Sequence, residues 1–196
     1  YAKSFYDPFL IGEDCFDLIL NMSVIQLVKS YLGGEFVLAE ANLKHDFGVN
    51  DVYFPLHADF SPGWSLKSDT YGKKVELTPD CLINPIAVGG LIYLHKTDEG
   101  AFCYSVGSHV MGAPKGSSLK IYPKEKQLEI EKNLVRITGE CGDLVLFDDR
   151  GFHGPHQPTN SSRKVLLFDY YKLQSFNGKT KTQIPVLANE LGRLNE

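Results

Sequence analysis

The sequence is poor in the residues and patterns that mark several protein classes. Its 196 residues include only four cysteines, two methionines and one tryptophan, and no Cys-x-x-Cys pair occurs. No apolar run reaches the roughly 18 residues that a membrane-spanning helix needs. Lys and Arg number 20 against 24 Asp and Glu, so there is no basic excess of the kind that binds nucleic acid. We therefore expect neither a membrane nor a nucleic-acid partner. The composition, 43% hydrophobic and 22% charged, also excludes a disordered or collagen-like chain.

The cysteines bear on the compartment in which the protein works. They lie far apart, which argues against a disulfide framework in a chain of this size. Cysteine is among the most buried residue types, so we expect free thiols in the core. Free thiols and the lack of a secretory pattern at the start predict a cytoplasmic protein. The chain begins at Tyr1 instead of a methionine, so we expect a processed or trimmed product. The cysteines are Cys15, Cys81, Cys103 and Cys141.

Apolar spacing divides the chain into a helix followed by many short strands. Spacings of three and four predict a helix over Glu13–Tyr31, which Gly33-Gly34 would end. Pro123–Glu131 is charged and predicts a surface helix or a loop. The strands alternate with Gly- and Pro-rich turns, which favours a closed or sandwiched all-β core. The expected strands are Glu35–Leu43, Val52–His57, Ile83–Leu94, Ala101–Val106, Leu134–Ile137, Leu144–Phe147 and Val165–Leu173.

The length suits a single domain that spans residues 1–196. Within it we expect a helical N-terminal part (1–34), a β core (about 35–172) and a polar C-terminal tail (173–196). No internal repeat or interdomain linker interrupts this division.

One short motif in the second expected strand carries chemistry. Residues two apart on a strand point to the same side, so His57 and Asp59 present an imidazole and a carboxylate together. Alone, such a pair is more often a surface pair at a strand end. Tyr53 shares their parity and Trp64 follows them, so both are candidates to line a substrate pocket, although core packing explains either residue as well.

A second segment makes a metal site the stronger interpretation. An apolar strand runs out into a polar loop that ends at His153, and Arg163 follows immediately before the next apolar strand. Two histidines and one carboxylate form the facial triad that suits non-haem Fe(II), with positions left open for a chelating co-substrate and O2. The planar guanidinium of an arginine pairs bidentately with a carboxylate.

The order of these parts resembles the phytanoyl-CoA dioxygenase family of Fe(II)- and 2-oxoglutarate-dependent oxygenases. The resemblance covers roughly residues 35–172. It implies a mainly β fold with flanking helices, built on a double-stranded β-helix (jelly-roll, cupin-like) core. The matching positions are His57-x-Asp59, Asp98–Phe102 leading to Gly107-Ser108-His109, Gly142-Asp143, His153 and Arg163.

The resemblance also implies a site and a reaction. His57, Asp59 and His153 would bind iron, and Arg163 would hold the far carboxylate of 2-oxoglutarate. No catalytic residue beyond the metal centre is implied. The expected reaction hydroxylates a small molecule with O2 and releases succinate and CO2. Desaturation, cyclisation or epimerisation at the same centre is the alternative, and a non-catalytic jelly-roll binding protein is the alternative from another class. The substrate and the oligomeric state stay open.

Three positions bear on how closely the family pattern is followed. Pro155 stands where the family often has a serine that helps to bind the co-substrate, so a hydroxyl must come from elsewhere, and Ser161 is one candidate nearby. His156 offers a competing register for the distal ligand, and we prefer His153 for its distance from Arg163. Asp59 is a carboxylate, unlike the Gly or Ala of related halogenases, which favours hydroxylation.

Overall fold

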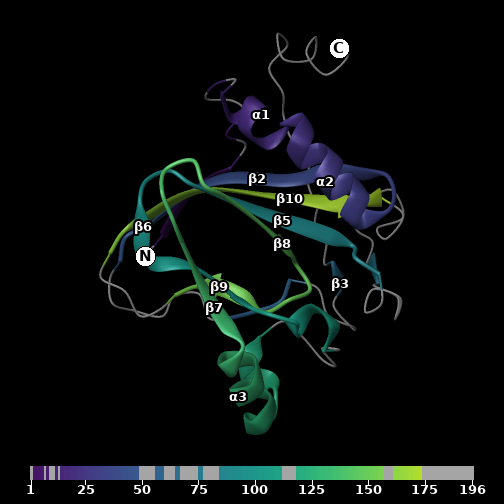
Figure 1. Ribbon diagram of the computed structural model, residues 1–196, viewed down its shortest axis with the longest axis vertical. Helices are drawn as coiled ribbons and strands as arrows, with labels where there is room; N and C mark the ends of the chain where they lie inside the picture. The colour runs from purple at the N-terminus through teal and green to yellow at the C-terminus, as the bar shows by residue number, and fades with distance from the viewer. Residues whose placement is uncertain are drawn as a thin grey trace.

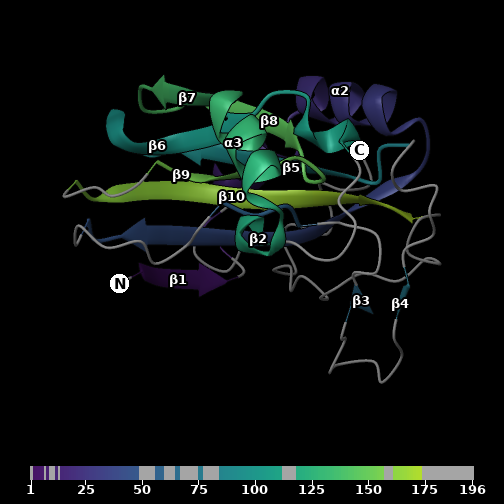
Figure 2. The same ribbon diagram turned by 90° about the horizontal axis from the view of Figure 1, so that it is seen from below.

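The computed structural model describes residues 2–6, 8, 12, 14–48, 56–59, 65–66, 75–76, 84–111, 118–156 and 161–173. Two antiparallel sheets face each other, and helices lie outside them (Figures 1 and 2). The strands are β1 (Ala2–Tyr6), β2 (Phe36–Asp46), β3 (Ser65–Leu66), β4 (Val75–Glu76), β5 (Ala87–Tyr93), β6 (Thr97–Ser105), β7 (Leu134–Gly139), β8 (Leu144–Asp148), β9 (His153–Pro155) and β10 (Arg163–Lys172). The helices are α1 (Asp14–Ile19), α2 (Met22–Leu32), α3 (Lys124–Lys132) and the 3-10 turns η3 (Ser108–Val110) and η4 (Leu119–Ile121).

The order of the strands identifies the fold. Of the two facing sheets, the larger runs β1-β2-β10-β5-β8 and the smaller runs β7-β6-β9, while β3 pairs with β4 in a separate two-stranded sheet. His57 extends the smaller sheet, because it forms an isolated antiparallel bridge with His153 on β9. Along the chain, β2, β5, β8 and β10 of the larger sheet interleave with His57, β6, β7 and β9 of the smaller one. This interleaving is a jelly roll, so the mainly β, cupin-like fold expected from the sequence is confirmed.

β10 lies at the centre of the larger sheet and is buried on both faces, which explains its nearly continuous apolar sequence. Leu166, Phe168 and Tyr170 point outward and pack against α1 and α2, which cover that face (Figure 1). Val165 points inward, into the cluster that fills the space between the sheets. The alternation follows directly from the two-residue period of a strand. β10 therefore contributes side chains both to the core under the helices and to the core between the two sheets.

The N-terminal part differs from expectation in two respects. The segment expected as one helix is broken into α1 and α2, because the side-chain oxygen of Asn21 accepts a hydrogen bond from the Ser23 N–H and begins a new helix. β1 pairs with β2, so the expectation of a helical part over residues 1–34 is wrong for residues 2–6. Gly33 ends α2 in the left-handed conformation at φ 63°, which confirms the expected stop.

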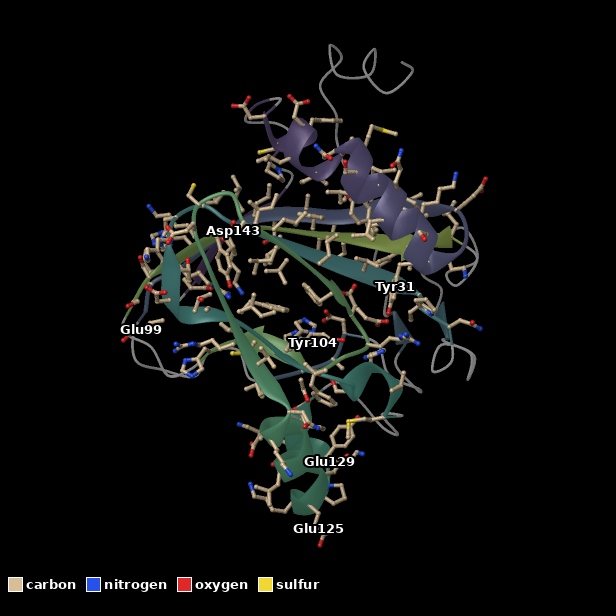
Figure 3. The ribbon with its side chains drawn as sticks, in the orientation of Figure 1. Tyr31, Glu99, Tyr104, Glu125, Glu129 and Asp143 are labelled. Carbon is tan, nitrogen blue, oxygen red and sulfur yellow. The ribbon has the colours of Figure 1, made fainter. Side chains whose placement is uncertain are left out.

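Other expectations are refined by the structure. The charged Pro123–Glu131 segment is mostly helical, as α3 (Figure 3 shows Glu125 and Glu129 projecting outward from it). The loop expected before His153 instead leads into a strand, β9. Cys15, Cys103 and Cys141 are free as expected, but Cys141 is exposed, so the core placement is wrong there. Cys81, Tyr53, Trp64 and the tail beyond residue 173 lie outside the described residues. No helix in the described ranges is long and apolar enough to cross a membrane.

Gly90 provides a test of how tightly the helical layer packs on the sheet. A Cβ atom at this position would collide with the ring of Phe168 on the neighbouring strand β10. We expect Gly90→Ala to lower the free energy of unfolding by about 1–3 kcal/mol, the usual cost of overpacking a core. Urea denaturation followed by circular dichroism measures this change. Gly12→Ala is the matched control, because a Cβ there meets nothing within 4 Å; equal stability of the two variants would contradict the packing account.

Candidate metal centre

The two histidines of the predicted triad are brought together by backbone pairing. The His57 N–H donates to the His153 carbonyl at 3.0 Å, and the His153 N–H donates to the His57 carbonyl at 2.8 Å. The two imidazole centroids lie 4.5 Å apart. The separation of the rings is therefore set by the antiparallel backbone bridge between His57 and β9.

Asp59 completes the cluster. Its Oδ1 lies 3.5 Å from Nε2 of His57, and its Oδ2 lies 3.3 Å from Nε2 of His153. All three donor atoms lie within 4.8 Å of one another. Donor atoms that share a first-row divalent ion lie roughly 3 Å apart at ordinary bond lengths. The three side chains can therefore bind one ion with little movement, and the backbone N–H of Asp59 is itself held by the Asp149 carbonyl at 2.9 Å.

The imidazole of His153 is held in the tautomer that a metal requires. Its Nδ1 lies 2.9 Å from the Gly151 carbonyl, which can only accept, so Nδ1 carries the proton and Nε2 presents a lone pair. Phe147 and Phe102 pack on the ring, with centroids 4.6 and 5.7 Å away. The side chain of His153 is 7% exposed, whereas that of Asp59 is 42% exposed. The cluster is thus fixed on the His153 side and open on the Asp59 side.

Ser108 anchors the segment that leads to His153. Its hydroxyl donates to the Ser105 carbonyl at 2.6 Å and accepts the N–H of Phe152 at 2.7 Å. The Gly-Ser-His stretch singled out in the sequence therefore contributes a structural serine, which ties the end of β6 to the residue immediately before the distal histidine.

The turn before His153 also contains a buried ion pair. The guanidinium of Arg150 binds the Asp148 carboxylate, with Nη2 to Oδ2 at 2.6 Å, and donates through Nη1 to the Asn84 carbonyl at 3.0 Å. The Tyr31 hydroxyl, from α2, donates to the same carboxylate at 2.6 Å. Because both charges have several partners, these interactions offset the desolvation cost of burying the pair. It gives the turn a fixed shape.

Asp149 is the least compensated group near the cluster. It is 1% exposed, and neither of its carboxyl oxygens has a hydrogen-bond partner of ordinary geometry in the described part of the chain. Burial, followed by the nearby carboxylates of Asp169 and Asp59, raises the pKa of Asp149 well above its ordinary value, although the Gly89 backbone opposes the rise. Burial in this position therefore disfavours the charged carboxylate.

Arg163 lies at the start of β10, directly opposite Asp46 on β2. Its Nε and Nη2 donate to one oxygen of Asp46 at 3.0 and 2.6 Å. Its Nη1 is buried and has no hydrogen-bond partner among the described residues. An orphaned guanidinium N–H in a buried setting costs free energy, so the position favours an anionic partner that the described protein groups do not supply.

None of the remaining predicted positions that the structure describes belongs to the cluster of three donors. His156 donates its backbone N–H to the Ala101 carbonyl, and it does not belong to the cluster of three donors. Pro155 is half-buried on β9. Ser161, a candidate to replace the missing serine, is exposed, and its hydroxyl donates to Glu99 at 2.9 Å. The predicted pocket residues Tyr53 and Trp64 lie outside the described residues.

Sequence reasoning missed Asp46 and Asp149. Asp46 orients Arg163 from 117 residues away, and only the register of β2 against β10 reveals the pairing. Asp149 lies in an acidic pair that looks like part of an ordinary polar turn. Its complete burial is a property of the folded interior, and no local pattern in the sequence indicates it.

Comparison with solved structures places the chain among proteins of the same fold. EctD from S. alaskensis, solved with bound Fe, is 20% identical with a TM-score of 0.64, and the match covers 88% of this chain and 58% of that one. HygX from Streptomyces hygroscopicus, solved with nickel, 2-oxoglutarate and hygromycin B, is 20% identical with a TM-score of 0.61, over 87% and 70% of the two chains. EvdMO1 is 15% identical with a TM-score of 0.57, over 86% and 35%.

The chain therefore spans about three fifths of the length of EctD. EctD has also been solved with 2-oxoglutarate and 5-hydroxyectoine. No family model matches the chain, and no curated protein matches it either.

Metal binding should depend directly on Asp59. We expect Asp59→Ala to weaken Co(II) or Ni(II) binding by more than about 100-fold, because loss even of a group that only supports a ligand typically costs 10–100-fold. Isothermal titration of the metal into the metal-free protein measures this. Asp98→Ala removes an exposed carboxylate outside the cluster and should leave the affinity unchanged. Tight binding retained in Asp59→Ala would show that the ion is held elsewhere.

The burial of Asp149 predicts a pH-dependent stability. Because the pKa of Asp149 is raised in the folded protein, the unfolded chain ionises first as the pH rises, and the fold loses stability up to the folded pKa. Asp149→Asn removes this cost while preserving the shape. We expect the metal-free variant to gain stability relative to the parent protein as the pH is raised from 4 toward neutrality. A stability difference that does not change with pH would contradict the assignment.

Proposed function

We propose that the protein is an Fe(II)- and 2-oxoglutarate-dependent dioxygenase that resembles the phytanoyl-CoA dioxygenase family and hydroxylates a small molecule, with release of succinate and CO2. The observation that carries this proposal is the combination of two imidazoles and one carboxylate within 4.8 Å with a buried guanidinium whose Nη1 lacks a partner. A cation site and an anion site built into one jelly roll suit a co-substrate that chelates a metal through one end and carries a carboxylate at the other.

The donor set fits the metal that the proposal requires. Two histidines and one carboxylate form the facial arrangement typical of non-haem Fe(II) oxygenases. When bound, Fe(II) would supply, with 2-oxoglutarate and O2 as co-substrates, the oxidising chemistry that hydroxylates the substrate. His57, Asp59 and His153 would hold the ion from one side. The carboxylate of Asp59 would occupy the position that a halide would need, which supports hydroxylation.

The chain's own groups divide the remaining tasks between them. Nδ1 of His153 keeps its proton on the Gly151 carbonyl, so Nε2 stays available as a ligand. Arg163, oriented by Asp46, would bind the far carboxylate of 2-oxoglutarate through Nη1. Phe147 and Phe102 cover the ring of His153 and exclude water from that side of the centre. The protein would thus position the metal and the co-substrate and exclude water from one side of the centre, whereas the cofactor would supply the redox chemistry.

The solved proteins of the same fold support this proposal. EctD and HygX have been crystallised with iron, and each also with 2-oxoglutarate and a small molecule, 5-hydroxyectoine or hygromycin B. A small-molecule substrate is accordingly proposed here as well. Identities of about 20% do not carry the particular substrate from those proteins to this chain.

The role of Arg163 gives the first direct test. We expect Arg163→Ala to weaken 2-oxoglutarate binding to the Ni(II)-loaded protein by more than about 10-fold, because a charge-assisted hydrogen bond contributes about 1.5–3 kcal/mol. Isothermal titration measures this directly and requires no substrate. The affinity for Ni(II) itself should be unchanged.

Arg136→Ala is the matched control, because Arg136 is an exposed arginine on β7. Activity is then measured as succinate release in a screen of candidate small molecules with Fe(II), 2-oxoglutarate and O2, in which Asp59→Ala should be inactive. Wild-type 2-oxoglutarate affinity in Arg163→Ala would place the carboxylate site elsewhere, and succinate release by Asp59→Ala would refute the proposed centre.

A further inference from the structure

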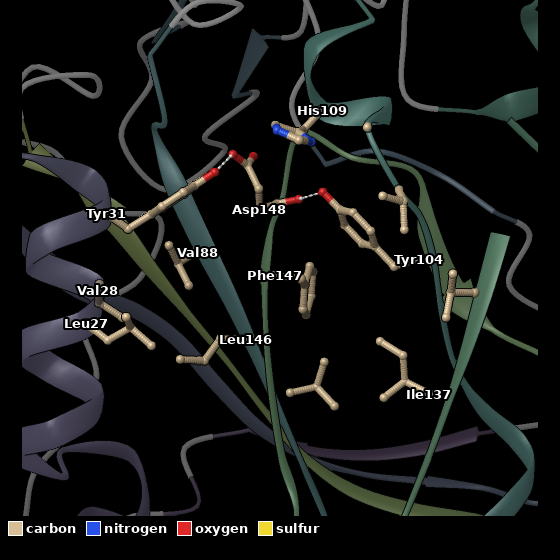
Figure 4. A pocket seen from close by; sticks show the side chains of 14 residues that line it. Leu27, Val28, Tyr31, Val88, Tyr104, His109, Ile137, Leu146, Phe147 and Asp148 are labelled. Carbon is tan, nitrogen blue, oxygen red and sulfur yellow. Dashed lines mark hydrogen bonds between the residues drawn. The ribbon is translucent and has the colours of Figure 1, made fainter. Parts of the chain in front are cut away.

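A largely apolar pocket lies between α2 and the free edges of the two sheets. Its volume is about 440 Å³, which falls within the range of small-molecule sites. Leu27 and Val28 of α2 form one wall, and Val135 and Ile137 of β7 contribute to the other (Figure 4). The edge strand β8 runs along the pocket between them. None of these residues belongs to the cluster of metal-binding donors.

The polar groups of the pocket gather at one end. Figure 4 shows Tyr31, Asp148, Tyr104 and His109 together there, with only apolar side chains at the other end. The Tyr31 hydroxyl donates to the Asp148 carboxylate at 2.6 Å, and the Tyr104 hydroxyl donates to the Asp148 carbonyl at 3.1 Å. Burial, with the neighbouring Asp148 carboxylate, raises the pKa of Tyr31 to about 12, so this phenol stays neutral. Tyr31, Tyr104 and Asp148 are therefore already satisfied.

His109 is the exception at this end. Its Nδ1 is buried and has no hydrogen-bond partner in the part of the chain that the structure describes. In the sequence, His109 adjoins Ser108, but only the serine has a structural hydrogen-bonding role there. A ring nitrogen without a partner costs free energy. His109 is itself one of the residues that line the pocket, so a bound ligand is the partner that this nitrogen lacks among the described residues.

We propose that this pocket binds a small, neutral, mainly apolar molecule that carries one hydroxyl group. The apolar end matches the body of such a molecule, and a hydroxyl both donates and accepts, so it suits His109 in either tautomer. The Asp148 carboxylate is already compensated by Arg150, which leaves no charge at this end for an anion or a cation to meet. The class of ligand is therefore a phenol or a compact aliphatic alcohol.

The pocket adjoins the metal centre without being part of it. Phe147 forms part of the pocket wall, and its ring centroid lies 4.6 Å from that of His153. A bound molecule would therefore lie one side chain away from a predicted metal ligand. The proposal does not rest on the proposed function, because none of the residues that line the pocket belongs to the cluster of three donors.

A second copy of the chain is the main competing occupant. A stable protein interface buries about 800 Å² on each partner, and it has no need of an unmet imidazole. The pocket volume of about 440 Å³ and the single unsatisfied group favour a small molecule. The experiment therefore also monitors the oligomeric state.

The test uses 2-naphthol as the probe and the full chain without added metal, followed by isothermal titration. We expect saturable binding, weakened by more than about 10-fold in Leu27→Glu and in Val135→Glu, because each places a charge in the apolar wall. Both residues are partly exposed, at 59% and 47%, so the variants should fold, which circular dichroism checks. Leu128→Glu changes an equally exposed leucine on α3, outside the pocket, and should bind as the parent protein does.

His109→Phe isolates the polar contact. It should weaken 2-naphthol by roughly 2- to 12-fold, the effect of one hydrogen bond, and leave 2-methylnaphthalene unaffected. Naphthalene-2-sulfonate should bind less tightly than 2-naphthol to the parent protein. The proposal is overturned if 2-naphthol does not saturate the protein or if Leu27→Glu binds it normally. It is also overturned if sedimentation shows a dimer of the parent protein that Leu27→Glu dissociates, because the groove would then be an interface between copies.

Discussion

The backbone pairing of His57 with His153 is the interaction on which the candidate metal centre depends. Two hydrogen bonds of 2.8 and 3.0 Å join the first metal motif to the beginning of β9, so the two imidazoles project from neighbouring paired backbones. Asp59 is held in the same way, through its N–H and the Asp149 carbonyl. The three donors are therefore positioned by peptide geometry, and only short side chains separate the donor atoms from the backbone that holds them. The jelly roll matters to function chiefly because it forces these segments to pair.

Elements that depend on local periodicity could be predicted from the sequence, whereas elements set by a single hydrogen bond could not. The apolar pattern of β10 reflects burial on both faces, and the pattern over Glu13–Tyr31 correctly indicates helix. The break in that helix depends on one hydrogen bond of the Asn21 side chain. The break leaves the spacing of the apolar residues unchanged, so the pattern does not reveal it. β9 is three residues long, too short for any period to be visible, and it exists because His57 and β6 pair with it.

The candidate site shows the same division. The residue types of the triad could be proposed from their order, and the structure brings His57, Asp59 and His153 together. Their surroundings could not be predicted, because they depend on contacts between distant segments. Asp46 meets Arg163 through the register of two adjacent strands, and Asp149 is exceptional because the fold buries its carboxyl oxygens without a hydrogen-bond partner of ordinary geometry among the described residues. The residue types in the sequence thus indicate which chemistry the site can perform, whereas the orientation of the side chains and the electrostatics of the site depend on the packing.

The pairing of Asp46 with Arg163 limits the length of any molecule that binds both the Arg163 guanidinium and the cluster of three donors. Asp46 holds one edge of the Arg163 guanidinium, and backbone hydrogen bonds hold the segments that carry the three donors, so each of the two charged sites is anchored to paired strands. A linear diacid that bridges the two sites, as the proposed co-substrate would, has to match the distance between them. A diacid with one methylene fewer would leave Nη1 of Arg163 without a partner, and a diacid with one methylene more would have to bend. The scaffold would therefore select among diacids by length.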